Sequence, residues 1–487
     1  MGLLDRAGGQ LTARAEDAEI LVVNTCSFID SAKQESVNAI LEMAQHKVTN
    51  GGKARRLIVA GCLVERYRDE IQRNIPEVDA VVGTGELEAI LEAAGLSAPA
   101  TPAAAQSSPF NILVSRAASA VHQHSLPINS TEVAPQLAPT SRAEGDLRER
   151  QGRFSRAQWE GATAALPEYL YSDETPRILT TPRSSAYIKI AEGCDHPCSF
   201  CIIPQLRGKF RSRRLESIVA EAQRLIAQGV REITLIGQDT TCYGEDLGLR
   251  DGLATLLDAL AVLPGLKWLR FLYAYPNKVT TRLLETIARH ETIAKYLDVP
   301  LQHASPSVLK RMKRGGTAEV FLRLIEKARA IVPGIVLRST FIVGFPGETD
   351  ADFKELCEFV AAAKIDWLGV FGYSDEEGAA AFALDAALKV PKRTIEARRR
   401  RLMKLQQKIS AKAKATWVGR EVDVLVEGES DETDLLWQGR TALHAPEIDG
   451  KVLINDFGPH ESLVPGTFYR AEITESHDYD VVARIIE

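Results

Sequence analysis

Residues 187–209 read YIKIAEGCDHPCSFCIIPQLRGK. Three cysteines, Cys194, Cys198 and Cys201, stand in this stretch with the spacing Cx3Cx2C. This spacing places three thiolates on one short loop, one fewer than a closed four-thiolate site needs. An apolar, strand-like run at residues 187–191 lies just before the first cysteine. The stretch therefore predicts a loop after a strand that binds a metal centre and leaves one metal position open.

Two kinds of metal site fit three cysteines. Zinc binds tetrahedral sets of Cys and His, so a structural zinc loop with His196 as fourth ligand is one interpretation. Against zinc, no second CxxC pair follows downstream, and Phe200 directly precedes the last cysteine. The stretch instead resembles the radical S-adenosylmethionine (SAM) enzymes. In those enzymes three cysteines bind a [4Fe–4S] cluster and the fourth iron chelates SAM.

Length and composition predict a multi-domain enzyme that is not anchored in a membrane. A chain of 487 residues with 45% hydrophobic and 25% charged residues indicates about three globular domains. No apolar run approaches the roughly 20 residues of a membrane span, and the N-terminus has no signal-peptide layout. Seven cysteines that cluster rather than pair indicate a reducing compartment. We therefore expect a cytoplasmic protein.

The first two regions differ sharply in composition. In residues 1–95, apolar runs at 19–23, 56–60 and 78–83 alternate with helical stretches at 31–45 and 65–74. This alternation predicts a parallel α/β domain. Residues 96–182 are rich in Ala, Pro, Ser and Thr without periodicity, which predicts a disordered linker.

The third region, residues 183–400, repeats a strand-then-helix pattern. Its six strand-like runs lie near Tyr187, Ile233, Leu269, Leu297, Val336 and Leu368. Six parallel units predict a partial (β/α)6 barrel with its active site at the C-terminal ends of the strands. Because Cys194 follows the first run, the cysteine loop is expected at that mouth.

The last region, residues 401–487, is expected to hold a connector helix and a small β-barrel. The helix is basic over residues 392–414, and short β-prone runs broken by Gly and Asp follow from residue 416.

Two further cysteines occupy matched positions in the N-terminal domain. Cys26 ends the first apolar strand and Cys62 ends the second. In a parallel sheet both would lie at the same edge, where such sheets bind ligands. They are either isolated buried thiols or part of a second cluster site.

Separate stretches in a fixed order resemble the methylthiotransferases of the radical SAM enzymes. The matching stretches are NTCSFIDSA at 24–32, AEGCD at 191–195, IPQLRGK at 203–209, GQDTT at 237–241, DVPLQH at 298–303, GFPGET at 344–349 and YSDEEG at 373–378. The chain is most similar to the branch that methylthiolates an aspartate of small-subunit ribosomal protein S-twelve. The resemblance implies a Rossmann-like N-terminal domain without its first strand, a radical SAM barrel and a C-terminal TRAM barrel, which is OB-like.

The resemblance also implies cofactors and partners. Cys194, Cys198 and Cys201 would bind the cluster that cleaves SAM, and the resulting radical would remove hydrogen from the aspartate. Cys26 and Cys62 would bind an auxiliary [4Fe–4S] cluster that supplies sulfur, with methyl from a second SAM. An electron donor such as flavodoxin or ferredoxin is expected, and the enzyme is expected to be a monomer.

Polar residues at expected strand ends are the candidates for SAM contacts. They are Gln238, Asp239, Gln302, His303, Arg338, Gly344 and Glu348. Asp239 is alternatively a helix cap, and His303 alternatively satisfies a loop.

One feature departs from the family pattern. The family has three cysteines in the N-terminal domain, and the first would precede the point where this chain begins, since residues 1–8 resemble the helix that follows it. Two thiolates alone would hold a cluster poorly. We expect a start codon that is assigned too late rather than a truncated chain.

The charge of the C-terminal region separates two substrate classes. Residues 416–487 contain 16 Asp and Glu against 5 Lys and Arg, a net charge of −11, whereas the whole chain carries −6. Such a region repels polyanionic RNA and attracts a basic ribosomal protein. This favours the ribosomal protein over the alternative substrate, a tRNA adenosine beside the anticodon. The basic helix favours RNA weakly, and a solvated acidic surface is a further interpretation.

Hypotheses of a different class remain if the first cysteine is truly absent. The chain would then bind and cleave SAM without transferring sulfur, or bind the ribosomal protein without catalysis.

Overall fold

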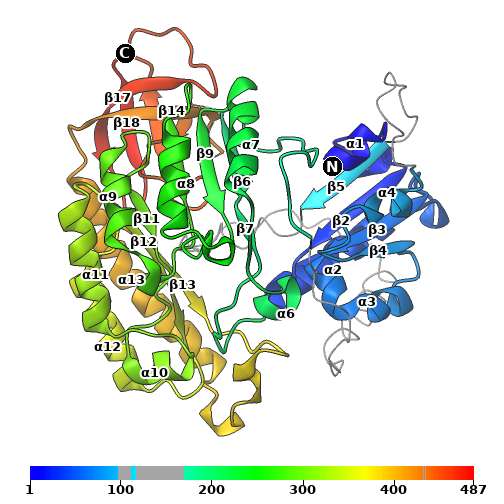
Figure 1. The fold of residues 1–487 in the computed structure, drawn as a ribbon, viewed down its shortest axis with the longest axis horizontal. Helices are drawn as coiled ribbons and strands as arrows, with labels where there is room; N and C mark the ends of the chain where they lie inside the picture. The colour runs from blue at the N-terminus through cyan, green and yellow to red at the C-terminus, as the bar shows by residue number, and fades with distance from the viewer. Residues whose placement is uncertain (97–110, 117–168, 432, 434) are drawn as a thin grey trace.

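The computed structural model describes residues 1–96, 111–116, 169–431, 433 and 435–487. Three parts follow one another along the chain: an N-terminal α/β domain, a barrel of parallel strands and a small C-terminal barrel (Figure 1). Most of the expected linker, residues 97–110 and 117–168, lies outside the described residues. None of the helices in the described residues combines the length and apolar composition that a membrane span requires.

The N-terminal domain is a parallel sheet with helices on both faces. Its strands are β1 (Gln10–Leu11), β2 (Ile20–Thr25), β3 (Arg56–Gly61), β4 (Ala80–Val82) and β5 (Asn111–Arg116), in the order β1-β5-β2-β3-β4. Its helices are α1 (Gly2–Arg6), α2 (Asp30–Ala44), α3 (Cys62–Asn74) and α4 (Ala89–Ala94). Leu21 and Val23 of β2 belong to one core, and Ile20 and Val22 belong to the other. Side chains alternate between the faces of a strand, so burial on both faces explains the continuous apolar run.

One strand of this sheet comes from the segment expected to be a linker. β5 pairs in parallel with β1 and with β2, and so occupies the position between them. Its sequence, NILVSR, is a short apolar run inside a stretch dominated by small and polar residues. The N-terminal domain therefore extends beyond the expected boundary at residue 95.

The second part is an open barrel of six main parallel strands. Its strands are β6 (Ser185–Lys189), β9 (Glu232–Ile236), β10 (Trp268–Phe271), β11 (Tyr296–Asp298), β12 (Val336–Val343) and β13 (Trp367–Gly372). They form two sheets, ordered β10-β9-β6 and β11-β12-β13, and a parallel bridge from Leu269 to Ile293 lies beside β10. Each strand contains or begins at one of the six positions expected from the sequence. β6 and β13 are the two end strands, so the barrel is open between them.

Helices surround the outer face of this barrel (Figure 1). They are α7 (Leu215–Ala227), α8 (Gly252–Ala261), α9 (Thr281–Arg289), α10 (Pro306–Arg311), α11 (Ala318–Ile331), α12 (Asp350–Ala363) and α13 (Lys392–Ala415). Two short strands, β7 (Ala191–Glu192) and β8 (Arg211–Ser212), and helix α6 (Ile203–Arg207) flank the cysteine loop. The basic helix expected as a connector is α13. Its Ile395 and Leu402 are buried in the barrel core, so the helix is also part of the barrel wall.

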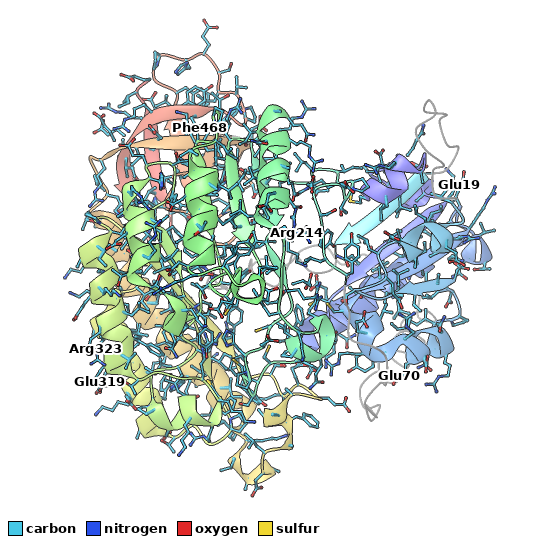
Figure 2. All side chains as sticks on the ribbon, in the orientation of Figure 1. Glu19, Glu70, Arg214, Glu319, Arg323 and Phe468 are labelled. Carbon is cyan, nitrogen blue, oxygen red and sulfur yellow. The ribbon has the colours of Figure 1, made fainter. Side chains whose placement is uncertain are left out.

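The third part is a closed barrel at the N-terminal ends of the parallel strands. Its strands are β14 (Glu421–Glu429), β15 (Trp437–Arg440), β16 (Val452–Asp456), β17 (Phe468–Ser476) and β18 (Val481–Ile485), in the order β14-β15-β16-β18-β17. Phe468, which is labelled in Figure 2, belongs to this barrel. Its ring packs edge-on against Trp268, the first residue of β10, with ring centroids 4.7 Å apart. The indole of Trp367, the first residue of β13, donates to the Leu443 carbonyl at 3.0 Å.

A buried ion pair network joins the two barrels. The carboxylate of Glu232 in β9 accepts from Arg440 of the C-terminal barrel at 2.7 Å and from Arg270 at 3.0 Å. The Ser185 hydroxyl donates to the same carboxylate at 2.9 Å. Burial alone would raise the pKa of Glu232, but the two guanidinium groups outweigh it and lower this pKa to about 2. A buried charge is tolerated only when it is paired in this way.

We predict that Arg440→Ala lowers the free energy of unfolding by about 3–5 kcal/mol, because it leaves a buried carboxylate with only one cationic partner. Denaturant unfolding followed by tryptophan fluorescence measures this loss. The matched control is Arg484→Ala, which breaks an exposed pair with Glu472 and should cost less than about 1 kcal/mol. An equal effect of the two variants contradicts the prediction.

The same network predicts a pH dependence. The pKa of Glu232 is lowered on folding, so its contribution to stability is complete above its ordinary value of 4.5 and is lost as the pH falls toward 2. Glu232→Gln should therefore flatten the dependence of unfolding free energy on pH between these values. A parallel curve for the variant and the parent chain would show that Glu232 is not the titrating group.

Candidate active site at the mouth of the barrel

The three cysteines of the Cx3Cx2C stretch lie on the loop that follows β6 and β7. The Cys194 amide donates to the Gly208 carbonyl at 3.3 Å, and the Cys201 amide donates to the Cys198 carbonyl at 3.1 Å. Gly193 has φ +80°, and a Cβ there would lie 2.1 Å from the Lys209 carbonyl oxygen. Only glycine fits this close approach. The backbone therefore turns sharply just before the first thiol, at the C-terminal end of the strand.

Residues from the far side of the barrel hold this loop. The Ser199 amide donates to the Met312 carbonyl at 3.0 Å, and its hydroxyl donates to the Arg311 carbonyl at 2.8 Å. The guanidinium of Arg314 donates to the Cys198 sulfur at 3.6 Å and lies over the Tyr275 ring, 4.5 Å from its centroid. Sequence reasoning did not single out Arg314. Its only signal is a basic, glycine-containing run that starts at the last residue of α10, RMKRGG at residues 311–316.

The thiols fit a cationic metal centre. Burial is the main cause that raises the pKa of Cys194 to about 11 and that of Cys201 to about 12, and the neighbouring thiols add to it against a backbone hydrogen bond to each sulfur. Thiolates crowded in this way need a strong positive charge to stabilise them, as an iron cluster provides.

His196 points to Asp239 and not to the three cysteines. Its Nε2 lies 2.6 Å from the Asp239 carboxylate, and its ring stacks on Tyr275 with centroids 3.8 Å apart. The Cys242 thiol donates to the same carboxylate at 3.0 Å. His196, Asp239 and Cys242 form a group whose ligand atoms lie within 4.8 Å of one another. The arrangement does not support His196 as the fourth ligand of a zinc loop.

Three of the predicted SAM contacts present unsatisfied polar atoms. The amide oxygens of Gln238 and Gln302 and the Nε2 of His303 are buried and have no hydrogen-bond partner among the described residues. Gln302 also adopts φ +73°, a conformation that non-glycine residues rarely hold. Buried polar atoms are normally paired, so these three atoms fit a polar ligand that is bound at the mouth.

Gly344 and Glu348 form one structural unit after β12. The Glu348 carboxylate accepts from the backbone amides of Gly344 and Phe345, the latter at 3.2 Å, and pairs with Arg398 of α13 at 3.0 Å. Burial raises the pKa of Glu348 to about 7, although Arg398 opposes this. His303 lies 3.8 Å from the same carboxylate. Gly344, Glu348 and His303 are therefore close together, and Glu348 also shapes the turn.

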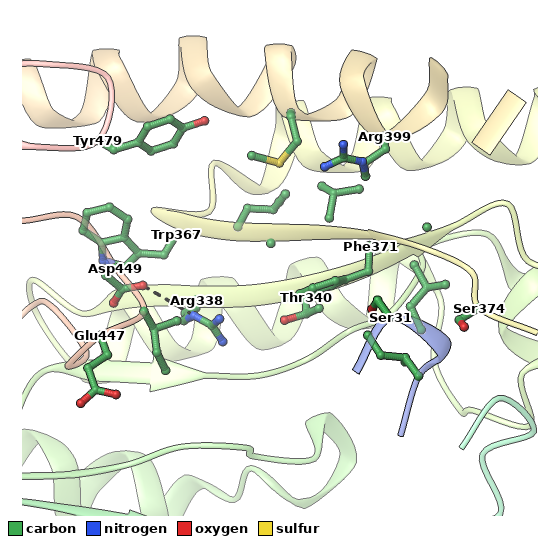
Figure 3. Close-up of a pocket in the computed structure, with 18 of the residues that line it drawn as sticks. Ser31, Arg338, Thr340, Trp367, Phe371, Ser374, Arg399, Glu447, Asp449 and Tyr479 are labelled. Atoms are coloured by element: carbon green, nitrogen blue, oxygen red, sulfur yellow. Dashed lines mark ion pairs between the residues drawn. The ribbon is translucent and has the colours of Figure 1, made fainter. Parts of the chain in front are cut away.

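Two other predicted contacts have partners within the protein. Asp239 accepts from His196, Cys242 and Thr241, the latter two at 3.0 and 2.8 Å, so its carboxylate anchors the cysteine loop. Arg338 is the third residue of β12 and pairs with Asp298 at 2.9 Å and with Asp449 of the C-terminal barrel at 3.6 Å (Figure 3). The structure thus places Arg338 toward the opposite end of the barrel from the cysteine loop.

The N-terminal cysteines lie next to the cysteine loop. Cys26 follows β2 and Cys62 follows β3, and these strands end in register at Thr25 and Gly61. Cys62 packs against Ile202 and Leu206, which follow Cys201 in the chain. The strand-end positions expected from the sequence therefore bring both sets of thiols to the junction of the two domains.

Arg207 lies beside the thiols of the N-terminal domain. Its guanidinium hydrogen-bonds to the Cys62 thiol and lies 3.4 Å from the Glu192 carboxylate, while its Nε is buried and has no hydrogen-bond partner in the described part of the chain. Burial raises the pKa of Cys62 and Cys26, and the Arg207 charge opposes this. A positive charge and an unpaired N–H beside two thiols fit an anionic group held there.

Charged residues hold the two domains together at this junction. Arg66 of α3 donates to the Ser27 carbonyl and the Glu377 carbonyl, both at 2.9 Å, and lies 3.4 Å from the Glu376 carboxylate. Lys33 of α2 also pairs with Glu376, at 3.2 Å. Glu376 and Glu377 belong to the YSDEEG stretch that follows β13, so this stretch fixes the N-terminal domain at the mouth of the barrel.

A cavity of about 1440 Å³ runs along the open side of the barrel (Figure 3). Its walls include Phe200 of the cysteine loop, Ser31 of α2, Gln302 and residues of β12, β13, α13 and the C-terminal barrel. Pockets for a small ligand measure about 300–1,000 Å³, so this cavity is large enough for a ligand and part of a second molecule.

Comparison with known proteins agrees with this architecture. The radical SAM superfamily matches residues 188–360, a TRAM domain matches residues 418–486, and the Uncharacterized protein family UPF0004 matches residues 1–83. The ribosomal protein uS12 methylthiotransferase RimO of Koribacter versatilis is 64% identical over 100% of this chain and 92% of its own length. RimO of Solibacter usitatus is 53% identical over 100% of this chain and 90% of its own length. Among solved structures, the radical SAM methyltransferase TsrM of Kitasatospora setae covers 72% of this chain and 62% of its own, with 16% identity and a TM-score of 0.43.

We predict that Arg314→Met lowers the reduction potential of a cluster bound at Cys194, Cys198 and Cys201. The reason is that the variant removes a positive charge and a hydrogen bond from the Cys198 sulfur. A potentiometric titration followed by electron paramagnetic resonance measures the change. Lys313→Met is the matched control. Lys313 is exposed, and this substitution removes the same charge one residue away from Arg314. Equal shifts in both variants would contradict a specific role of Arg314.

Proposed function

The chain belongs to the RimO family of ribosomal protein uS12 methylthiotransferases, and on this premise we propose which of its residues carry out each part of the reaction. The enzyme is a radical SAM methylthiotransferase, a transferase of sulfur-containing groups. The proposed product is a 3-methylthioaspartate in uS12. The observation that carries the assignment is the loop of Cys194, Cys198 and Cys201, fixed at the barrel mouth beside unsatisfied polar atoms.

The three loop cysteines are proposed to bind a [4Fe–4S] cluster. When bound there, this cluster supplies the electron that generates a radical from SAM, the chemistry that an unactivated C–H bond requires. The protein contributes position and charge. Ser199 and Asp239 anchor the loop, and Arg314 places a positive charge beside one thiolate.

SAM is proposed to bind between this loop and the C-terminal ends of the strands. Gln238, Gln302 and His303 offer the buried polar atoms that have no partner among the described residues. Gly344 and Glu348 shape the turn after β12 that closes the same region, and Asp239 acts there through His196. Arg338 is better explained by its ion pairs with Asp298 and Asp449 than by a SAM contact.

The thiols of the N-terminal domain are proposed to bind the group that supplies sulfur. Cys26 and Cys62 would hold an auxiliary [4Fe–4S] cluster, with the Arg207 charge beside them, and a second SAM would supply the methyl group. Their position next to Ile202 supports a transfer over a short distance, because it places both sets of thiols at one junction.

The proposed partner is the basic ribosomal protein uS12, attracted by the acidic C-terminal barrel. We further propose a flavodoxin or ferredoxin as electron donor, a monomeric enzyme and a cytoplasmic location. All seven cysteines are free, which supports a reducing compartment.

Two sets of cysteine variants test the assignment. Replacing Cys194, Cys198 and Cys201 by Ala should remove about four irons per chain and abolish both SAM cleavage and modification of uS12. Replacing Cys26 and Cys62 by Ala should preserve SAM cleavage and abolish modification. Iron and sulfide content, formation of deoxyadenosine and the mass of uS12 measure these outcomes. Cys357→Ala, which alters a half-buried thiol in α12, is the control and should change none of them.

Three results would overturn parts of this proposal. Modification of a tRNA adenosine in place of uS12 would support the alternative substrate. Uncoupled SAM cleavage by the parent chain, with only about four irons, would show that this chain does not assemble the auxiliary cluster. Modified uS12 from the Cys26/Cys62 variant would show that sulfur does not pass through these thiols.

A further inference from the structure

A protein substrate that binds to the acidic barrel must also extend to the cysteine loop at the other end of the parallel strands. The acidic C-terminal barrel lies at the N-terminal ends of the strands, whereas the cysteine loop lies at their C-terminal ends. The cavity of about 1440 Å³ spans this distance, since its walls include Glu447 of the C-terminal barrel and Phe200 of the cysteine loop. A substrate that contacts the acidic barrel and reaches the mouth can therefore follow the open side of the barrel.

The edge of β13 is exposed to this cavity. β13 pairs with β12 on one side, and among the described residues no strand pairs with its other side. All six residues from Trp367 to Gly372 line the cavity. Successive side chains of a strand point to opposite faces. Residues from both faces of β13 therefore line this cavity, which fits a cavity that runs along the free edge of the strand.

The backbone groups on this edge are available for hydrogen bonding. The Tyr373 amide donates to the Val343 carbonyl of β12 at 2.8 Å. Because backbone groups along a strand alternate in direction, the amides and carbonyls of Leu368, Val370 and Gly372 point away from β12. No hydrogen bond from these groups occurs outside the β12 ladder in the described residues. Gly369 and Gly372 carry no side chain that would cover the edge.

The opposite edge of the opening, on β6, is already occupied. There the outward carbonyls belong to Ser185, Tyr187 and Lys189, because the Ile190 amide donates to Ile236 of β9. Side chains donate to each of them: Thr181 to Ser185, Arg177 to Tyr187 and Arg213 to Lys189, the last two at 2.9 and 2.8 Å. The outward carbonyls of β6 are thus bonded by side chains of the same chain, whereas no described residue bonds to those of β13.

We propose that an extended, basic segment of uS12 binds along the free edge of β13 as an additional strand. The inference rests on the proposed function and specifies how its substrate is held. Backbone hydrogen bonds to Leu368, Val370 and Gly372 supply the affinity and the alignment, as in other cases of strand addition. At the end of the cavity that lies at the C-terminal barrel, Glu447 is exposed and has no ion pair among the described residues. Its charge attracts a basic side chain of the segment.

The first experiment removes one amide from the edge. Val370→Pro deletes an outward N–H that the β12 ladder does not use, a position where an edge strand tolerates proline. Val370→Ala is the matched control, because it trims the same side chain and keeps the amide. The measurement is the binding of a fluorescent, unmodified uS12 peptide, which contains the aspartate that the enzyme modifies, to SAM-loaded holoenzyme. We expect affinity about tenfold weaker for Val370→Pro than for Val370→Ala, with equal unfolding midpoints.

The second experiment probes the peptide, so it does not depend on folding of a variant. Single N-methylation along the uS12 peptide removes one backbone donor at a time. Strand addition predicts that binding to the parent chain is lost at every second position and retained at the positions between. Glu447→Gln should in addition weaken binding at low salt and have less effect at high salt. Lysine-to-norleucine changes in the peptide should remove this difference.

The outcomes separate this inference from the proposed function. One outcome is that the enzyme modifies uS12 while N-methylation does not weaken binding at every second peptide position. In that case side chains hold the substrate and strand addition is wrong. Equal binding by the Val370 variants leads to the same conclusion. If the parent chain neither binds nor modifies uS12, the proposed function itself fails.

Discussion

The structure depends on one constraint: parallel strands all deliver their following loops to the same edge of a sheet. In the N-terminal domain β2 and β3 pair in parallel and end in register, so Cys26 and Cys62 follow neighbouring strand ends. In the barrel, the loop after β6 delivers the three remaining site cysteines to the mouth. Packing of Cys62 against Ile202 and Leu206 then brings the two edges together. The chemistry is thus concentrated at a junction by strand direction and by one apolar contact.

Much of the fold could be predicted from the sequence because its signals are local. The six barrel strands are apolar runs bounded by turns, and each was located from this pattern. β5 was not, because six residues with a weak apolar signal lie inside a stretch of small and polar residues. Its place in the sheet is set by pairing with β1 and β2, which depends on contacts distant in sequence.

The site shows a similar division. Cysteine spacing and the strand pattern were sufficient to place the thiols, Gln302 and His303 after their strands, while their roles stay proposals. They were not sufficient for Arg314, which reaches Cys198 from a loop more than 100 residues away. Arg338 shows the converse: it was expected among the SAM contacts at the mouth, its position early in β12 directs it to Asp449, and its contact with SAM stays a prediction. Placing such residues requires knowledge of where each strand begins, which is the least certain feature of a sequence pattern.

The buried contact of Glu232 with Arg440 has a consequence for substrate selection. Because it holds the C-terminal barrel firmly against the parallel strands, the acidic surface and the cysteine loop stay at a constant separation. If uS12 binds to this acidic surface as proposed, the enzyme measures a distance along its substrate. An extended chain advances about 3.3 Å per residue, so a fixed separation corresponds to a fixed number of residues between the basic anchor of a substrate and the residue that reacts. A protein with the same sequence around the reacting residue, but with a different number of residues between it and the basic anchor, would not place that residue at the reactive centre.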